Sequence, residues 1–202
     1  MRLFILSTTV LLQCSIMPRF FNWEARNADS QPDAILAALR IQPGWTVADI
    51  GSGGGYFSFR FAEATGPSGT GLAVDVNKDY LEYVAAEAKK RGLGWVRTVQ
   101  AHPESSGLNE ASIDLAFCRN VYHHLPDDRI AYFRGLKSAL KKDGRLAIID
   151  YKKSGRGFAI WTGHHTDPEQ IKSDLNQAGF TLVAEHTFLE EQSFLEFKPT
   201  GL

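Results

Sequence analysis

The chain has 202 residues, of which 44% are hydrophobic, and this suits one folded domain with a short extension. Its 22 Lys and Arg residues are balanced by 23 Asp and Glu residues. Because a basic excess is typical of proteins that bind nucleic acid, we expect no nucleic-acid partner. The two cysteines, Cys14 and Cys118, are too few for a disulfide framework and argue against a Cys-ligated metal site.

Residues 1–16 form an N-terminal extension that allows two interpretations. Arg2 precedes a mostly apolar run from Leu3 to Ile16, which is too short to span a bilayer comfortably but suits the apolar part of a signal peptide. Alternatively, translation starts at Met17 and the extension is dispensable. Both interpretations stay open, as does membrane association through residues 1–16. A lipoprotein interpretation also stays open, because Leu11-Leu12-Gln13-Cys14 resembles a lipoprotein cleavage site, although Gln13 is larger than the residue expected there.

Residues 17–30 are polar and aromatic, with Phe20, Phe21 and Trp23 among them. We expect this segment to pack over the functional site or over the edge of a sheet. Residues 31–202 then make up the predicted domain, in which no internal repeat stands out.

Within residues 31–202, short apolar runs alternate with patterns typical of helices. Strands are expected at 45–50, 71–76, 95–100, 113–118, 145–150, 180–186 and 193–197. Helices are expected at 31–39, 56–65, 78–91, 127–140 and 168–178, with a turn at 142–144. This alternation predicts an α/β fold, a Rossmann-like doubly wound sheet with helices on both faces. The short connection between the last two strands predicts that the last strand is antiparallel.

The strongest motif is the glycine-rich segment Asp49-Ile50-Gly51-Ser52-Gly53-Gly54-Gly55, which follows the first predicted strand. Glycines let the backbone turn sharply and approach a ligand closely. A dinucleotide fingerprint needs a third glycine where Tyr56 stands. An acid at Asp49 would repel a pyrophosphate, but it suits a cationic amino-acid group.

Asp75 ends the second predicted strand, 24 residues after Gly51. A carboxylate at that edge of the sheet can accept hydrogen bonds from both hydroxyls of a ribose. Together, the loop and this acid predict a nucleoside-containing ligand with a positively charged group.

These motifs resemble those of class I S-adenosylmethionine-dependent methyltransferases. Val47 to Gly55 is similar to motif I of that family, and Ala73 to Val76 is similar to its ribose-binding strand end. Leu140 to Asp150 resembles its "LKPGGRL" segment. The resemblance spans roughly residues 30–198 and implies a seven-stranded sheet, mostly parallel with the last strand antiparallel.

The resemblance also implies roles for single residues. Asp49 would hold the methionine amino group, the glycines would carry the backbone beneath the cofactor, and Asp75 would bind the ribose. The usual acid of the adenine loop is missing, so His102 or the backbone there takes that role. Arg119 and Asn120 would close over the methionine part. The cofactor-binding set expected for S-adenosyl-L-methionine is Asp49, Gly51, Ser52, Gly53, Gly55, Asp75, Val76, His102, Arg119 and Asn120.

The segment Asn120-Val121-Tyr122-His123-His124-Leu125 resembles the "YHHL" segment of small-molecule members of the family. Tyr122 and His123 are expected to line the acceptor pocket, and His123 is a candidate general base because imidazole titrates near neutral pH. His124 is expected to pack under a helix as a hydrogen-bonded linker. A later cluster offers Trp161, His164 and His165 as candidates for substrate contact. The spacing of His, Asp and Glu residues does not match a metal site, and we expect none.

The leading hypothesis is therefore an S-adenosylmethionine-dependent methyltransferase that acts on a small-molecule acceptor. Since S-adenosylmethionine is made in the cytosol, a cytoplasmic location is expected. A nucleotide-dependent oxidoreductase of Rossmann type is one alternative, against which Tyr56 argues. A non-catalytic partner protein that binds S-adenosylmethionine is the other, and the altered loop at His102 keeps it open.

Overall fold

The computed structural model describes residues 6–153 and 163–201, with only the backbone described for residues 6–15. Its seven strands are β1 (Thr46–Ile50), β2 (Thr70–Asp75), β3 (Val96–Gln100), β4 (Ile113–Arg119), β5 (Leu140–Tyr151), β6 (Phe180–His186) and β7 (Gln192–Pro199). The helices are α1 (Leu6–Ala25), α2 (Pro32–Leu39), α3 (Tyr56–Thr65), α4 (Lys78–Lys90), α5 (Arg129–Ala139) and α7 (Pro168–Gln177). Short 3₁₀ turns occur at η1 (Ala28–Ser30) and η2 (Tyr122–His124).

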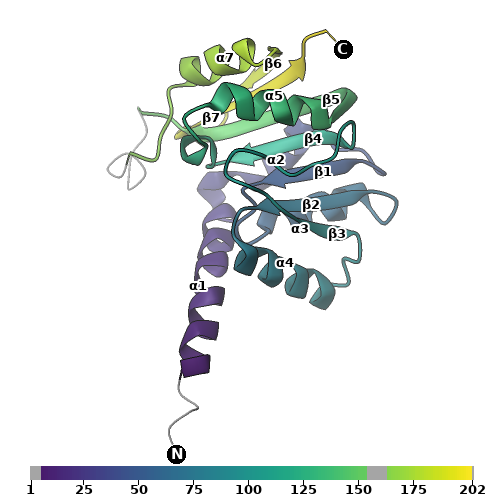
Figure 1. Ribbon diagram of the computed structural model, residues 1–202, viewed down its shortest axis with the longest axis vertical. Helices are drawn as coiled ribbons and strands as arrows, with labels where there is room; N and C mark the ends of the chain where they lie inside the picture. The colour runs from purple at the N-terminus through teal and green to yellow at the C-terminus, as the bar shows by residue number, and fades with distance from the viewer. Residues whose placement is uncertain (1–5, 154–162, 202) are drawn as a thin grey trace, which may run out of the picture.

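The strands form one sheet in the order β3-β2-β1-β4-β5-β7-β6 (Figure 1). Strands β1 to β5 pair in parallel, whereas β7 is antiparallel to both of its neighbours, β5 and β6. The predicted α/β class, the seven strands and the antiparallel last strand are confirmed.

Helices cover both faces of this sheet. On β1, Val47 belongs to the same buried cluster as Phe61 of α3, whereas Ile50 belongs to the cluster that holds Phe133 of α5. Because both faces are buried, the central strands carry apolar residues at consecutive rather than alternate positions, as in Leu115-Ala116-Phe117-Cys118 of β4.

The sheet's architecture brings the carboxyl ends of the parallel strands to one edge. Helix α3 begins just after β1, with Gly55 as its N-cap, and α4 begins just after β2, where the side chain of Asn77 caps the helix. The loops that leave β1, β2, β4 and β5 therefore share one edge, which is where open α/β sheets bind ligands.

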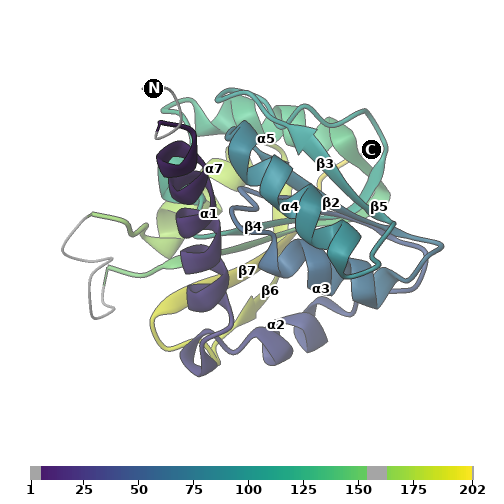
Figure 2. The ribbon, with the colours of Figure 1, turned by 90° about the horizontal axis from the view of Figure 1, so that it is seen from below.

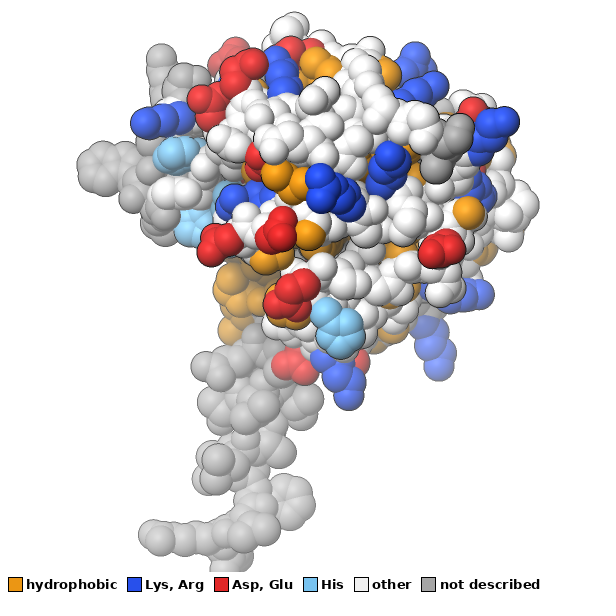
Figure 3. Space-filling view, turned by 45° about the horizontal axis from the view of Figure 1, so that its top comes forward, with side chains coloured by type: hydrophobic (Ala, Val, Ile, Leu, Met, Phe, Trp, Pro, Cys, Tyr) orange, Lys and Arg blue, Asp and Glu red, His pale blue; other side chains and the backbone are white. Residues whose placement is uncertain are grey.

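Helix α1 was not predicted from the sequence. Its end lies beside α3 and α4, while its first half extends away from the body of the molecule (Figures 1 and 2). Hydrophobic side chains gather where the described part of α1 meets the body (Figure 3), and Phe20 and Trp23 of this helix are more than half exposed, at 52% and 56%. Among the described residues, no helix has the length and hydropathy needed to cross a membrane.

One local prediction was wrong in detail. The expected turn at 142–144 lies inside β5 as an irregularity, because Ile113 pairs with Leu140 while Leu115 pairs with Arg145. The backbone of β5 thus stays in the sheet on both sides of Gly144, and the extra residues bulge out locally.

Candidate functional site

A cavity of about 870 Å³ lies at the carboxyl edge of the sheet. The loops after β1, β2, β3 and β4 line it, together with the last turns of α1. Of the predicted site residues, Gly55 and Tyr122 are absent from its lining, whereas the lining includes Asp49, Gly51, Ser52, Gly53, Asp75, Val76, His102, Arg119, Asn120 and His123.

The glycine-rich loop has the conformation for which glycine is needed. Gly51, Gly53 and Gly55 all have positive φ angles, of 69°, 51° and 76°. The loop is held on the sheet because the backbone amides of Gly51 and Ser52 donate to the carbonyl oxygen of Val74, over 2.8 and 3.1 Å. A ligand in the cavity therefore faces bare backbone here rather than side chains.

Gly54 fixes the position of the N-terminal helix. A Cβ atom at Gly54 would lie 2.0 Å from the carbonyl oxygen of Pro18, and the side chain of Asn22 donates to the Gly54 carbonyl over 2.8 Å. Gly54 thus lets α1 approach the loop, a role that the sequence motif does not reveal.

Two buried carboxylates flank the loop. Asp75 accepts from the backbone amides of Gly53 and Asn77, each over 2.9 Å, which leaves further lone pairs of the carboxylate available to a ligand. Asp49 is 4% exposed and accepts from the hydroxyl of Ser58 over 2.6 Å. Burial raises the pKa of Asp49 to about 7, so a cationic ligand group beside it would stabilise the charged form.

The cavity is lined by polar atoms without partners. Among the described residues, three buried side-chain atoms have no hydrogen-bond partner: Oδ1 of Asn22, Oγ of Ser52 and Nε of Arg119. All three residues line this cavity. Because buried polar groups are nearly always satisfied, these atoms indicate the place of a polar ligand.

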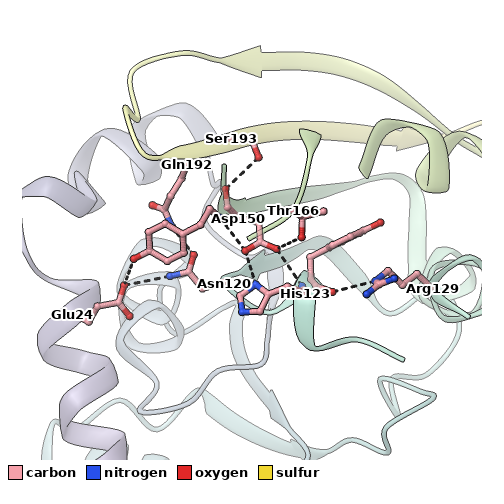
Figure 4. Close-up of polar contacts among 10 residues, drawn as sticks. Glu24, Asn120, His123, Arg129, Asp150, Thr166, Gln192 and Ser193 are labelled. Atoms are coloured by element: carbon pink, nitrogen blue, oxygen red, sulfur yellow. Dashed lines mark hydrogen bonds and ion pairs between the residues drawn. The ribbon is translucent and has the colours of Figure 1, made fainter. Parts of the chain in front are cut away.

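Glu24 of α1 joins the residues after β4 in one network (Figure 4). Its Oε1 accepts from the Asn120 amide over 3.3 Å. The same oxygen also accepts from the Tyr151 hydroxyl over 3.1 Å and from the Arg119 guanidinium over 3.2 Å. Asn120 has a positive φ of 54°, which asparagine tolerates better than most residues, and its Oδ1 accepts from Gln192. Burial raises the pKa of the Tyr151 phenol to about 12, so this phenol stays protonated and donates.

Val76, which follows β2, and His102, which follows β3, also line the cavity. Val76 is 55% exposed and offers an apolar surface directly after Asp75. The backbone of His102 forms an isolated bridge with Ser105, which fixes the loop after β3.

His123 is held by a buried carboxylate at the end of β5 (Figure 4). Asp150 is fully buried, and its Oδ1 lies 2.8 Å from Nδ1 of His123. Asp150 also accepts from the backbone amides of His123 and Tyr151 and from the hydroxyl of Thr166. An ionised carboxylate only accepts hydrogen bonds, so in the neutral imidazole Nδ1 of His123 is the nitrogen that carries the proton toward Asp150, and Nε2 carries the lone pair.

The predicted role of Tyr122 in the acceptor pocket is wrong. Its ring is 1% exposed and stacks on Phe133, and its hydroxyl donates to Asp174 over 2.5 Å. The η2 turn rotates Tyr122 into the core, and burial together with Asp174 raises the pKa of its phenol.

Tyr122→Phe is expected to destabilise the protein by about 1–3 kcal/mol, because it leaves the buried Asp174 carboxylate without one donor. Thermal unfolding should show a lower Tm for Tyr122→Phe, and Tyr83→Phe on α4 controls for the loss of a hydroxyl. Ligand binding in the cavity should not change. A variant as stable as the wild type would contradict this structural role.

The expectation for His124 is also wrong. Instead of packing under a helix, its side chain is exposed at the cavity, where it meets His123 and His164. Partial burial and the two neighbouring imidazoles lower the pKa of His124. His164 lines the cavity as well, His165 does not, and Trp161 lies outside the described residues.

Sequence reasoning missed Asp150 and Glu24 as site residues. Asp150 had a usable signal, because it ends a predicted strand at the same sheet edge as Asp75. No sequence pattern could have identified Glu24, because it contacts Arg119, which lies 95 residues away in the sequence.

Comparison with known proteins agrees with this geometry. The model of a family described as "Methyltransferase domain" matches residues 41–193. The chain is 32% identical over 105 residues to the uncharacterized methyltransferase YcgJ of Bacillus subtilis, covering 52% of this chain and 40% of that protein. It is 31% identical over 124 residues to the ubiquinone/menaquinone biosynthesis C-methyltransferase UbiE of Rhizobium etli, covering 60% and 48%. The chain thus spans less than half the length of these curated relatives.

Solved structures share the fold. A SAM dependent methyltransferase from Aquifex aeolicus superposes with a TM-score of 0.76 at 23% identity, covering 82% of this chain and 88% of that one. The 1,6-didemethyltoxoflavin-N1-methyltransferase of Burkholderia thailandensis, solved with S-adenosylhomocysteine bound, gives 0.68 at 23% identity, covering 89% and 81%. With the family match, these findings confirm the resemblance in the sequence: the chain belongs to the family of class I S-adenosylmethionine-dependent methyltransferase domains.

Proposed function

We propose that this chain transfers a methyl group from S-adenosylmethionine to a small, mainly apolar acceptor. The observation that carries the proposal is one continuous cavity, which is lined both by the carboxylates of Asp49 and Asp75 and by the histidines at 123 and 124. Its volume, about 870 Å³, falls in the range of small-molecule sites.

In the cofactor part of the cavity, each feature fits one portion of S-adenosylmethionine. The Asp49 carboxylate would bind the ammonium of the methionine portion, and Asp75 would accept from the ribose hydroxyls. The exposed side chain of Val76 provides an apolar surface for the adenine. The unsatisfied Oγ of Ser52 and Nε of Arg119 would find partners on the polar groups of the same ligand.

Bound S-adenosylmethionine supplies a methyl group already activated on a positively charged sulfur. The chain therefore needs to place the nucleophilic atom of the acceptor in line with that methyl and to exclude water. With a hydroxyl acceptor, the proton passes to Nε2 of His123. The acceptor oxygen would form the new bond to the methyl carbon, and the electron pair of the broken bond would stay on the sulfur. Asp150 stabilises the imidazolium and keeps the ring oriented.

The lining of the cavity includes several apolar and aromatic side chains besides the residues assigned to the cofactor, among them Met17, Phe20, Leu125, Pro126 and Tyr132. Such a surface suits a flat phenolic or quinone-like acceptor. Two relatives support this choice by their names: the UbiE protein above and a nocamycin O-methyltransferase of Saccharothrix syringae. The latter is 30% identical over 117 residues, covering 56% of this chain and 40% of that protein.

The test is turnover of S-adenosylmethionine with a panel of phenols and reduced quinones, with release of S-adenosylhomocysteine as the readout. His123→Gln should lower kcat about 100-fold or more while the KM for S-adenosylmethionine changes little, because the imidazole acts on the acceptor. His165→Gln, which removes a histidine outside the cavity lining, is the control. Equal kcat values for His123→Gln and the wild type would contradict the assignment of the base.

A further inference from the structure

Three histidines converge in the acceptor part of the cavity. His123 and His124 belong to the η2 turn, and His164 lies in the segment that leads to α7. One ring nitrogen of each lies within 4.8 Å of those of the other two. The ring centroids are 4.2 Å apart for His123 and His124, and 5.1 and 5.0 Å from His164. All three residues line the cavity.

The environment of His123 is typical of a metal ligand. A histidine that binds a metal through one ring nitrogen usually donates its other N–H to a carboxylate, which fixes the tautomer and the ring orientation. Asp150 accepts from Nδ1 of His123 in this way, over 2.8 Å. Three further donors hold the Asp150 carboxylate, so its position is fixed by the fold.

We propose that His123, His124 and His164 bind one divalent transition-metal ion of the zinc type. Imidazole nitrogens suit such ions, whereas Mg²⁺ and Ca²⁺ prefer oxygen ligands. Zn–N bonds of about 2.0–2.1 Å in a tetrahedral site keep the ligand nitrogens about 3.3 Å apart. The nitrogens lie within 4.8 Å of one another, so the rings would have to close in by up to about 1.5 Å for all three to bind one ion.

Three protein ligands leave the fourth position of the ion open toward the cavity, as in zinc sites that bind a substrate or water. An acceptor with a hydroxyl or phenol oxygen would occupy that position as its anion, after releasing its proton to water. This consequence rests on the proposed function. Without the ion, His123 accepts the proton of the acceptor as proposed above. With the ion bound, the lone pair of His123 is used for coordination, and the ion takes over this role by lowering the pKa of the acceptor oxygen.

Metal binding is tested without S-adenosylmethionine, so the result is separate from that of the proposed function. Tag-free protein is treated with a chelator and titrated with Zn²⁺ by calorimetry and with Co²⁺ by visible absorption. We expect one ion per chain and the intense visible bands of four-coordinate Co²⁺.

Variants show which residues bind the ion. His124→Ala and His164→Ala each remove one ligand and should weaken Zn²⁺ binding by about 100-fold or more, while Asp150→Asn should weaken it by about 10–100-fold. His165→Ala, adjacent to His164 but outside the cavity lining, should bind as the wild type does. Circular dichroism of each variant checks the fold. Failure of the wild type to bind one ion, or equal losses in His164→Ala and His165→Ala, would overturn the proposal.

Discussion

Replacing Asp75 with alanine is expected to weaken S-adenosylmethionine binding by at least about 100-fold. Hydrogen bonds to a charged acceptor contribute about 1.5–3 kcal/mol each, and the ribose would lose two of them. The variant also frees the Gly53 amide, which now donates to Asp75 over 2.9 Å, so the glycine-rich loop loses a constraint. Calorimetric titration of the variant measures the loss directly.

A matched control shows whether the loss of binding is specific to Asp75 or follows the loss of any acidic side chain. Glu82 is an exposed acid on α4 that pairs with Lys78, and Glu82→Ala should leave the affinity unchanged. Gly53→Val is expected to abolish binding too, because its backbone has a φ of 51° and a Cβ there would lie 3.0 Å from the ring of Phe21. Affinities of Asp75→Ala within threefold of the wild type would contradict the ribose assignment.

Asp49→Asn is expected to have two opposite effects, a loss of cofactor binding and a gain of stability at high pH. The folded-state pKa of Asp49, about 7, lies above the ordinary aspartate value of 3.8. The folded protein therefore retains a proton that the unfolded chain has lost, and stability falls as the pH rises from about 4 to 7. Above that range the charged carboxylate costs about 4 kcal/mol, since each pKa unit corresponds to about 1.4 kcal/mol.

The measurement is urea unfolding of the wild type and of Asp49→Asn at pH 4.5 and pH 8. The difference between the free energies of unfolding of Asp49→Asn and of the wild type should be larger, in favour of the variant, at pH 8 than at pH 4.5. Asp143→Asn, at an exposed position of β5, should show no such change. The affinity of the wild type for S-adenosylmethionine should increase about tenfold from pH 6 to pH 8, because only the ionised carboxylate attracts the ammonium. An affinity independent of pH would contradict this role of Asp49.

The sheet, and the carboxyl edge at which the glycine-rich loop lies, could be predicted from the sequence because both depend on local patterns of residues. The short apolar runs that lie between glycines predict β1 and β2. The glycine-rich loop requires positive φ angles, which glycine adopts readily, so its sequence predicts its conformation. The acids Asp49 and Asp75 then follow from their places at the strand ends.

The acceptor side was harder to predict. The η2 turn decides which of three consecutive side chains faces the core, and no period of 2 or 3.6 applies to a single turn. Tyr122 and His124 therefore exchanged the roles expected of them. His164 and Glu24 reach the cavity only through tertiary packing, from segments far from η2 in the sequence.

The central claim is that the cavity at this sheet edge binds S-adenosylmethionine. Calorimetric titration of the wild-type chain with S-adenosylmethionine, and separately with NAD, tests it most directly. The account predicts saturable binding of one S-adenosylmethionine per chain and none of NAD. Absence of S-adenosylmethionine binding, or equal affinity for NAD, would contradict it.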